Sequence, residues 1–300
     1  YLLQFDPSTE VWEKILQLQQ TGYFQYVEPD YIGHGLSATD TFPNDPEFFL
    51  QHGCYNDGVD WTFLTLKEDA DMDMELAWDV ERGSDKIVVA ILDSGAKLDH
   101  TDLADRIYVN PQEMANGVDD DNNGFVDDRH GWDFVNNDND PTDDHGHGTK
   151  VSGLMGASTN NAYGMAGIDW HCQLMQCKVL NQNNFGFYTW WAAAIYYAVD
   201  NGADVICLAA GGVDYSSLLK EAVDYAVSNG VTLISSVGNL DNNQPFYPSA
   251  YPNAIAVGAT DPEDLRAAPY VSATSGGSNY GEFLDVVAPG DYVYSLSHTD

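Results

Sequence analysis

One histidine in this chain lies in surroundings suited to proton transfer. His147 stands between Gly146 and Gly148 in the segment 143–153, and three apolar residues follow it at helical spacing, namely Val151, Leu154 and Met155. An imidazole titrates near neutral pH, so a histidine at a glycine-lined helix start can accept and release a proton. A metal ligand or a merely exposed histidine would show the same pattern, and His147 therefore needs partners from elsewhere in the chain.

Two polar residues that follow apolar runs are the natural partners. Asp93 comes directly after the run 87–92, and Asn239 comes soon after the run 231–237. Continuous apolar runs of this length are typical of strands buried on both faces of a parallel sheet. Because the carboxyl ends of parallel strands meet at one edge of the sheet, we expect Asp93 and Asn239 to lie near His147.

The rest of the chain alternates strands with helices. Further strands are expected at 174–180, 204–208, 254–259 and 283–287, and helices at 73–80, 189–199 and 218–228. This alternation predicts an α/β fold, a doubly wound parallel sheet with helices on both faces. Residues 1–36 are predicted to form a separate small α+β piece, with a helix over 10–19 and a strand over 24–32.

The composition excludes several classes of partner. The chain has 300 residues, 47 Asp and Glu against 11 Lys and Arg, and a formal net charge of −36. Such acidity argues against nucleic acids and anionic membrane surfaces, because their phosphates attract basic proteins. No apolar run is long enough to span a bilayer. We expect a monomer with neither nucleic acid nor membrane as a partner.

The four cysteines do not form a metal-binding pair. None of them belongs to a Cys-x-x-Cys motif; they are Cys54, Cys172, Cys177 and Cys207. Cys207 lies in an apolar run and is expected to be a buried thiol. A disulfide between Cys172 and Cys177 stays open as an alternative to two free thiols.

Three segments together resemble one family, the subtilisin-like serine peptidases or subtilases. They are Leu92-Asp93-Ser94-Gly95, His147-Gly148-Thr149 and Val237-Gly238-Asn239. Supporting segments follow in the family's order across roughly residues 75–300, among them His100–Leu103, Asn201–Ile206, Tyr247–Pro248, Tyr251–Ala259 and Val287–Gly290. Each motif alone is weak, but their joint order is specific to this family.

The resemblance implies a serine endopeptidase that hydrolyses peptide bonds. Asp93 would orient His147, His147 would act as general base and acid, and Asn239 would donate its side-chain amide to the oxyanion. Because Gly148 and Thr149 follow His147, the base is expected there, and His145 would be a rim residue. In relatives an extended substrate pairs with a strand that here carries small residues, which predicts wide subsites; the positions are Leu208, Ala209, Ala210 and Gly211.

The family's serine nucleophile is missing from the sequence. Relatives carry it in a Gly-Thr-Ser-like stretch beyond an Ala-Pro-Gly turn, and no Gly-Thr-Ser or Gly-x-Ser-x-Gly occurs in the chain. Ser295 and Ser297 lack the flanking glycine and small residues. We therefore expect these 300 residues to be inactive and interpret them as a fragment cut at both ends. The alternative is a non-catalytic subtilase-like domain that binds peptide or calcium.

The resemblance also divides the chain into parts. Residues 1–36 resemble the C-terminal part of an inhibitory propeptide, with Val27–Ile32 as its last strand. Residues 37–73 would form a linker and the N-terminal arm of the mature enzyme, and 74–300 the peptidase domain. The partners implied are polypeptide substrates and the protein's own propeptide, and the location implied is extracellular.

An acidic run between Asp93 and His147 predicts a calcium site. Residues 119–128 offer hard oxygen ligands at EF-hand-like spacing; the candidates are Asp119, Asp121, Asn123, Asp127 and Asp128. An EF-hand would require Glu at position 130, which is His130, so a tighter loop is expected. So many carboxylates repel one another without a cation. A solvated acidic loop is the alternative.

A second calcium site is implied by the resemblance alone. Gln51, Asp102 and Asn161 match positions that hold calcium in many subtilases. Backbone carbonyls near Tyr163 and Met165 would complete the site. Calcium is therefore the one cofactor expected, in a structural role.

Overall fold

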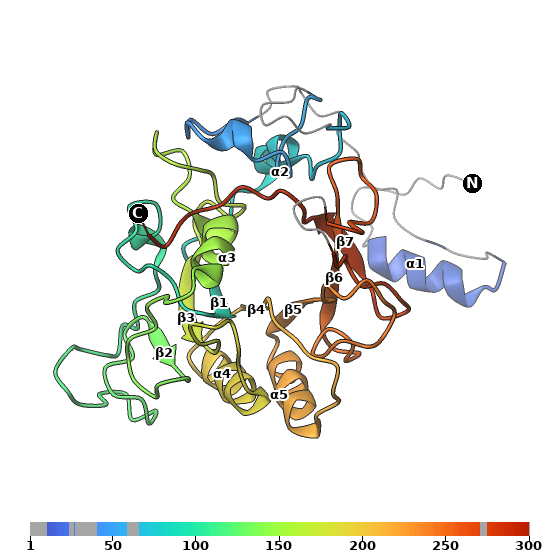
Figure 1. Cartoon of the computed structure of the whole chain (residues 1–300). Helices are drawn as coiled ribbons and strands as arrows, with labels where there is room; N and C mark the ends of the chain where they lie inside the picture. The colour runs from blue at the N-terminus through green and yellow to red at the C-terminus, as the bar shows by residue number, and fades with distance from the viewer. Residues whose placement is uncertain (1–10, 24–26, 28–40, 59–65, 271–274, 300) are drawn as a thin grey trace. The chain divides into compact units, whose positions relative to one another are not determined.

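The computed structural model describes residues 11–23, 27, 41–58, 66–270 and 275–299 (Figure 1). The chain divides into two compact units, Tyr1–Thr39 and Asp40–Asp300. In the first unit, α1 (Val11–Gln20) forms where a helix is predicted. The strand predicted over 24–32, including Val27–Ile32, lies outside the described residues except for Val27.

The second unit is built on a seven-stranded parallel sheet, which confirms the predicted fold class. Its strand order is β2-β3-β1-β4-β5-β6-β7. The strands are β1 (Val88–Asp93), β2 (Gly131–Asp133), β3 (Gln173–Lys178), β4 (Val205–Leu208), β5 (Thr232–Ser236), β6 (Ile255–Thr260) and β7 (Val286–Pro289). The helices of this unit are α2 (Met74–Val80), α3 (His147–Gly156), α4 (Tyr188–Asp200) and α5 (Ser217–Ser228), with 3-10 turns at Phe48–Leu50 and Ala104–Arg106.

Helices cover both faces of the sheet. Successive side chains of a strand point to opposite faces, so a strand with a continuous apolar run places apolar side chains on both faces. In β1, Val88, Ala90 and Leu92 pack into a core shared with α4 and α5, whereas Val89 and Ile91 pack on the side of α3. Figure 1 shows α4 and α5 on one side of β1 and α3 on the other. Every residue of β1 is buried, in agreement with its continuous apolar run.

Two strands differ from the sequence predictions. β2 was not predicted, because its three residues follow a run of turn formers and acids that hides the pattern. β7 begins at Val286 instead of Phe283. The backbone N–H of Leu284 donates to the carbonyl of Gly281 in a turn, so the chain becomes extended only after Asp285, whose carboxylate accepts from the N–H of Ala256 at 2.9 Å.

The disulfide left open between Cys172 and Cys177 does not form. Both thiols are free and buried. Cys172 packs on the α3 side of the sheet and Cys177 on the α4 side, so their sulfur atoms face away from each other across β3.

The described part of the predicted linker belongs to the second unit. The backbone N–H of Thr41 donates to the carbonyl of Glu75 at 3.2 Å. Further along, the Gln51 amide binds both the N–H and the carbonyl of Ala166, at 2.8 and 2.7 Å. The arm is therefore fixed by hydrogen bonds to other segments, one of which lies 115 positions away.

Replacing Gly131 with alanine should destabilise the chain by about 2–4 kcal/mol. Gly131 has φ +116°, and an added Cβ would lie 1.8 Å from the carbonyl oxygen of Gln176, so β2 would have to move away from β3. Gly230→Ala is the matched control, because Gly230 has φ +82° but open space around an added Cβ. It should cost only about 1 kcal/mol. Urea unfolding measures both, and equal losses would contradict the prediction.

Candidate active site

A buried carboxylate holds the imidazole of His147. Asp93 is the last residue of β1 and is fully buried, and His147 is the first residue of α3. Nδ1 of His147 lies 2.7 Å from Oδ1 and 2.9 Å from Oδ2 of Asp93. This hydrogen bond raises the pKa of His147, although burial opposes the shift. With Nδ1 bound to Asp93, Nε2 is the ring nitrogen that can exchange a proton with another group.

A second buried carboxylate, that of Asp143, joins the end of β1 to the start of α3. Its Oδ1 accepts from the Ser94 hydroxyl and from the N–H of Gly146, both at 2.8 Å. Its Oδ2 accepts from the N–H and the hydroxyl of Thr149 at 2.9 and 2.6 Å. The Ser94 oxygen in turn accepts from the N–H of Gly148 at 2.9 Å. Burial would raise the pKa of Asp143, but the hydrogen bonds outweigh it and lower that pKa.

A buried lysine supports the same edge of the sheet from β3. Lys178 is the register partner of Asp93, and its side chain is 2% exposed. Its Nζ donates to the carbonyl of Ser94 at 2.7 Å and to the Asp144 carboxylate at 2.6 Å. Lys178 therefore links the turn after β1 to the loop that leads into α3.

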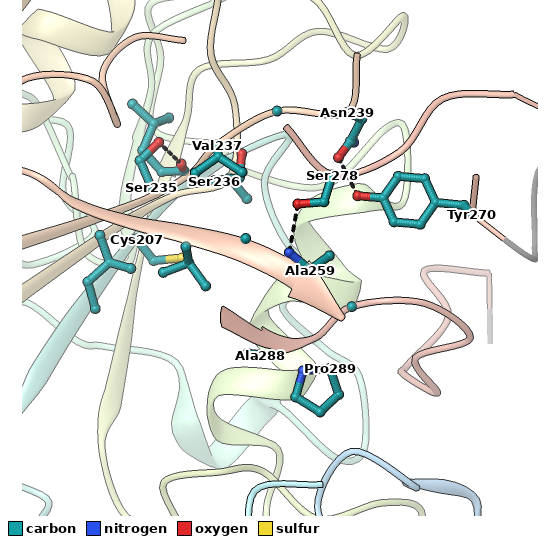
Figure 2. Close-up of a pocket in the computed structure, with 17 residues that line it drawn as sticks. Cys207, Ser235, Ser236, Val237, Asn239, Ala259, Tyr270, Ser278, Ala288 and Pro289 are labelled. Carbon is teal, nitrogen blue, oxygen red and sulfur yellow. Dashed lines mark hydrogen bonds between the residues drawn. The ribbon is translucent and has the colours of Figure 1, made fainter. Parts of the chain in front are cut away.

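Asn239 lies at the same edge of the sheet, after β5. Because only β4 separates β1 from β5, Asp93 and the end of β5 are roughly 10 Å apart at ordinary strand spacing. Asn239 borders a pocket of about 270 Å³ (Figure 2). The pocket has an apolar lining, which includes Cys207, Ile234, Val257, Ala259 and Ala288. Cys207 is only partly buried, in contrast to the prediction, and desolvation raises its pKa to about 12.

The predicted substrate strand continues from β4. The Leu208 side chain is buried in the core on the α4 side, and its carbonyl accepts from the Ser235 hydroxyl at 2.9 Å. Ala209, Ala210 and Gly211 are partly exposed. An added Cβ at Gly211 would lie 2.3 Å from the ring of Phe246, so only glycine fits there.

Three carboxylates meet beside the predicted calcium loop. Oxygen atoms of Glu113, Asp121 and Asp128 lie within 4.8 Å of one another, and Glu113 and Asp128 are buried. A set of hard oxygen donors at this spacing suits Ca²⁺. Burial raises the pKa of Asp128, although hydrogen bonds from Tyr197 and Asn123 oppose the shift.

The other predicted ligands of this loop, Asp119, Asn123 and Asp127, form hydrogen bonds to its backbone or to its carboxylates. Asp119 accepts from two backbone N–H groups of the loop, at 3.1 and 2.9 Å. The Asn123 side-chain amide donates to two carboxylates of the group, at 3.2 and 3.0 Å. Asp127 accepts from the N–H groups of residues 116 and 117, so its carboxylate serves a different part of the loop.

Two buried carboxylates form the second acidic region. Asp102 accepts from the Asn161 side-chain amide at 2.8 Å, and Asp45 accepts from the N–H of Asn161 at 3.3 Å. Burial raises the pKa of both carboxyl groups. Of the three predicted ligands, Asp102 and Asn161 are therefore in contact, and Asp45 also binds Asn161. The side chain of Gln51 is hydrogen-bonded to the backbone of Ala166 instead.

A family model decides which proteins this chain is related to. The model of the subtilase family, Peptidase S8, matches residues 84–300. The chain belongs to the subtilase family. This subtilase is 37% identical to thermitase from Thermoactinomyces vulgaris over 223 residues, which cover 74% of the chain and 69% of thermitase. It is 35% identical over 267 residues to the thermophilic serine proteinase of Bacillus sp. strain AK1, covering 89% of the chain and 55% of that protein.

A solved structure supports the same fold for this subtilase. A protease from Pseudoalteromonas arctica PAMC 21717 superposes with a TM-score of 0.64 at 26% identity, covering 85% of the subtilase and 74% of that protease. The subtilase therefore spans little more than half the length of the Bacillus proteinase and about three quarters of the length of the Pseudoalteromonas protease.

Several residues at these sites were not selected from the sequence. Asp45 lies in a turn with two prolines, and Glu113 lies before the acidic run, so neither belongs to a recognisable ligand pattern. Lys178 lies within the strand predicted at 174–180, whose apolar pattern gives no sign of a charge-bearing role. Their roles depend on contacts with distant segments, which local spacing does not encode.

Replacing Asp93 with asparagine should lower the pKa of His147. In the wild type this pKa lies above 6.5, and without the Asp93 carboxylate the opposing effect of burial remains. Because the folded-state pKa is raised, the pair stabilises the fold below pH 6.5, and this contribution is lost as pH rises through the raised value. An NMR titration of the imidazole resonances measures the pKa, and unfolding at several pH values measures the stability.

The control for this titration is Asp99→Asn. Asp99 is an exposed carboxylate bound by Lys97 at 3.1 Å. This substitution should leave the titration of His147 unchanged. A His147 that titrates identically in the wild type and in Asp93→Asn would rule out the hydrogen bond as the source of the shift.

Proposed function

We propose that this subtilase hydrolyses peptide bonds by serine-type acyl transfer, with Asp93, His147 and Asn239 in its active site. The main support is the hydrogen bond between the buried Asp93 carboxylate and the partly exposed imidazole of His147 at the carboxyl edge of the sheet. A carboxylate that fixes one imidazole nitrogen lets the other act as a base toward a hydroxyl group. Membership of the subtilase family supports the same chemistry.

Each residue would have a distinct role. His147 would take the proton of an attacking serine hydroxyl and return it to the leaving amine, while Asp93 stabilises the imidazolium. The Asn239 amide would donate to the oxyanion, a role whose loss typically costs about 100- to 1,000-fold in kcat. The polypeptide substrate would lie extended along Leu208–Gly211, where Ala209 and Ala210 leave room for bulky side chains.

The nucleophile is a separate part of this proposal. In the described part of the chain, no serine hydroxyl is hydrogen-bonded to the imidazole of His147. The Ser94 hydroxyl is engaged with Asp143, and the Ser295 hydroxyl donates to the carbonyl of Lys150. The sequence has no Gly-Thr-Ser stretch. We infer that these 300 residues alone are inactive and that activity requires a serine from outside them.

Activity assays on two samples test the proposal. The product of the complete gene should cleave an unstructured protein, and the 300 residues alone should be slower by on the order of a million-fold, the usual effect of losing the serine. His147→Ala in the complete product should cause a similar loss, whereas His145→Ala should change the rate only a few-fold. Near-normal turnover by the 300 residues would refute the missing nucleophile. An inactive complete product would favour a non-catalytic binding domain.

We also propose that calcium binds at the two acidic regions in a structural role. Glu113, Asp121 and Asp128 would hold one ion, and Asp45, Asp102 and Asn161 the other. The support is the donor chemistry: carboxylate oxygens within 4.8 Å of one another, and buried carboxyl groups whose pKa is raised by desolvation. A bound cation would offset the repulsion between these carboxylates.

Removing calcium should lower the melting temperature. A ligand at 100 times its Kd stabilises the folded state by about 2.7 kcal/mol, which corresponds to roughly 5–10 °C for a chain of this size. Excess EDTA should therefore lower the Tm by that amount per site, and calcium should restore it. Asp121→Asn should reduce the response to EDTA, whereas Asp105→Asn, at an exposed position, should not. An unchanged Tm in EDTA would exclude both sites.

We propose that this subtilase is a monomeric enzyme that acts outside the cell. We also propose that residues 1–36 are part of its own propeptide and act as an inhibitory partner. Among the described residues, the longest helix, α4, has 13 residues, and none is long and apolar enough to cross a membrane. The net charge of −36 supports the proposal that neither nucleic acids nor anionic membranes are partners.

A further inference from the structure

The hydroxyl of Tyr270 contacts the side chain of Asn239. It donates a hydrogen bond to Oδ1 of Asn239 at 2.7 Å, and both residues line the pocket (Figure 2). Tyr270 comes from the segment after β6, 31 positions beyond Asn239. Within the described part of the chain, Nδ2 of Asn239 has no hydrogen-bond partner, so it is available to a group that enters the pocket.

A side-chain amide has two chemically opposite ends. The NH₂ group donates hydrogen bonds and would stabilise an oxyanion, whereas the carbonyl oxygen would repel it. The terminal torsion of an asparagine is broad and roughly two-fold, and Asn239 is exposed, so little else selects the productive orientation. A hydroxyl that donates to Oδ1 favours this orientation. In the flipped amide the phenol oxygen would accept from Nδ2 instead, which would occupy the oxyanion donor and leave the hydroxyl proton without an acceptor on Asn239.

The backbone on either side of Asn239 is already fixed by neighbouring residues. Asn279, which is 1% exposed, accepts from the N–H of Leu240 at 2.8 Å and donates to the carbonyl of Val237 at 2.9 Å. Arg266 donates to the Asp241 carboxylate at 2.7 Å. With the backbone held, the orientation of the Asn239 amide is the remaining degree of freedom.

We propose that Tyr270 is a positioning residue that aims the Asn239 amide at the oxyanion. This inference rests on the proposed function of Asn239. Burial raises the pKa of Tyr270, with the negative charge of Asp291 acting in the same direction and Arg266 opposing it, so the phenol remains a hydrogen-bond donor at neutral pH.

Kinetics of Tyr270→Phe in the complete, active protein test the inference. The ring is kept and only the donor is lost, so kcat on an amide substrate should fall about tenfold, less than the 100- to 1,000-fold expected when the amide itself is removed. KM should stay within twofold, because the oxyanion forms only in the transition state. Tyr280→Phe is the matched control: its ring faces the Arg266 guanidinium at 4.7 Å, and it is not among the residues that line the pocket.

A double-mutant cycle separates positioning from a general structural effect. If Tyr270 acts through Asn239, Tyr270→Phe should have no further effect on kcat in an Asn239→Ala background. A full tenfold loss in that background, or a Tyr270→Phe variant that matches Tyr280→Phe, would overturn the inference while leaving the proposed function intact. A complete wild-type protein without peptidase activity would overturn both.

Discussion

The carboxylate of Asp143 makes the contact on which the geometry of the site depends. It binds the hydroxyl of Ser94, at the end of β1, and the first turn of α3 at the same time, so strand and helix cannot move independently. Asp93 and His147, 54 positions apart, meet because these two elements are joined beside them. The long acidic segment between them can then fold around its own carboxylates without displacing the imidazole from its partner.

Buried charge at this edge of the sheet is balanced by specific partners. A helix N-terminus favours anions, which suits Asp143 and disfavours a protonated imidazole on His147. The Asp93 carboxylate reverses that preference, since its hydrogen bond raises the pKa of His147. Lys178 supplies a cation to the adjoining loop through Asp144. Asp93, Asp143 and Lys178 are buried, so removing the partner of any of them leaves a buried charge without compensation. This destabilises a fold more than the loss of a surface ion pair does.

The sequence predicts the fold and the Asp93–His147 pair well, because local patterns mark each element and the carboxyl edge of a parallel sheet brings the two residues together. Continuous apolar runs mark the buried strands, and glycines flank His147 within a few positions. Short or polar elements are harder to predict: β2 has three residues in an acidic region, and β7 starts late because a turn at Gly281 precedes it. Tyr270 and Glu113 could not be predicted, since each acquires its role from a tertiary contact that no local spacing reports.

Cys172, just before β3, and Cys177, within β3, face opposite sides of the sheet, and this has a consequence for the environments that the fold tolerates. No oxidant can join them without twisting the strand that lies beside β1, since their sulfur atoms are on different faces of the sheet. The described residues therefore owe no stability to a covalent cross-link. Because no disulfide holds these thiols in place, the packing of the described residues does not require an oxidising medium.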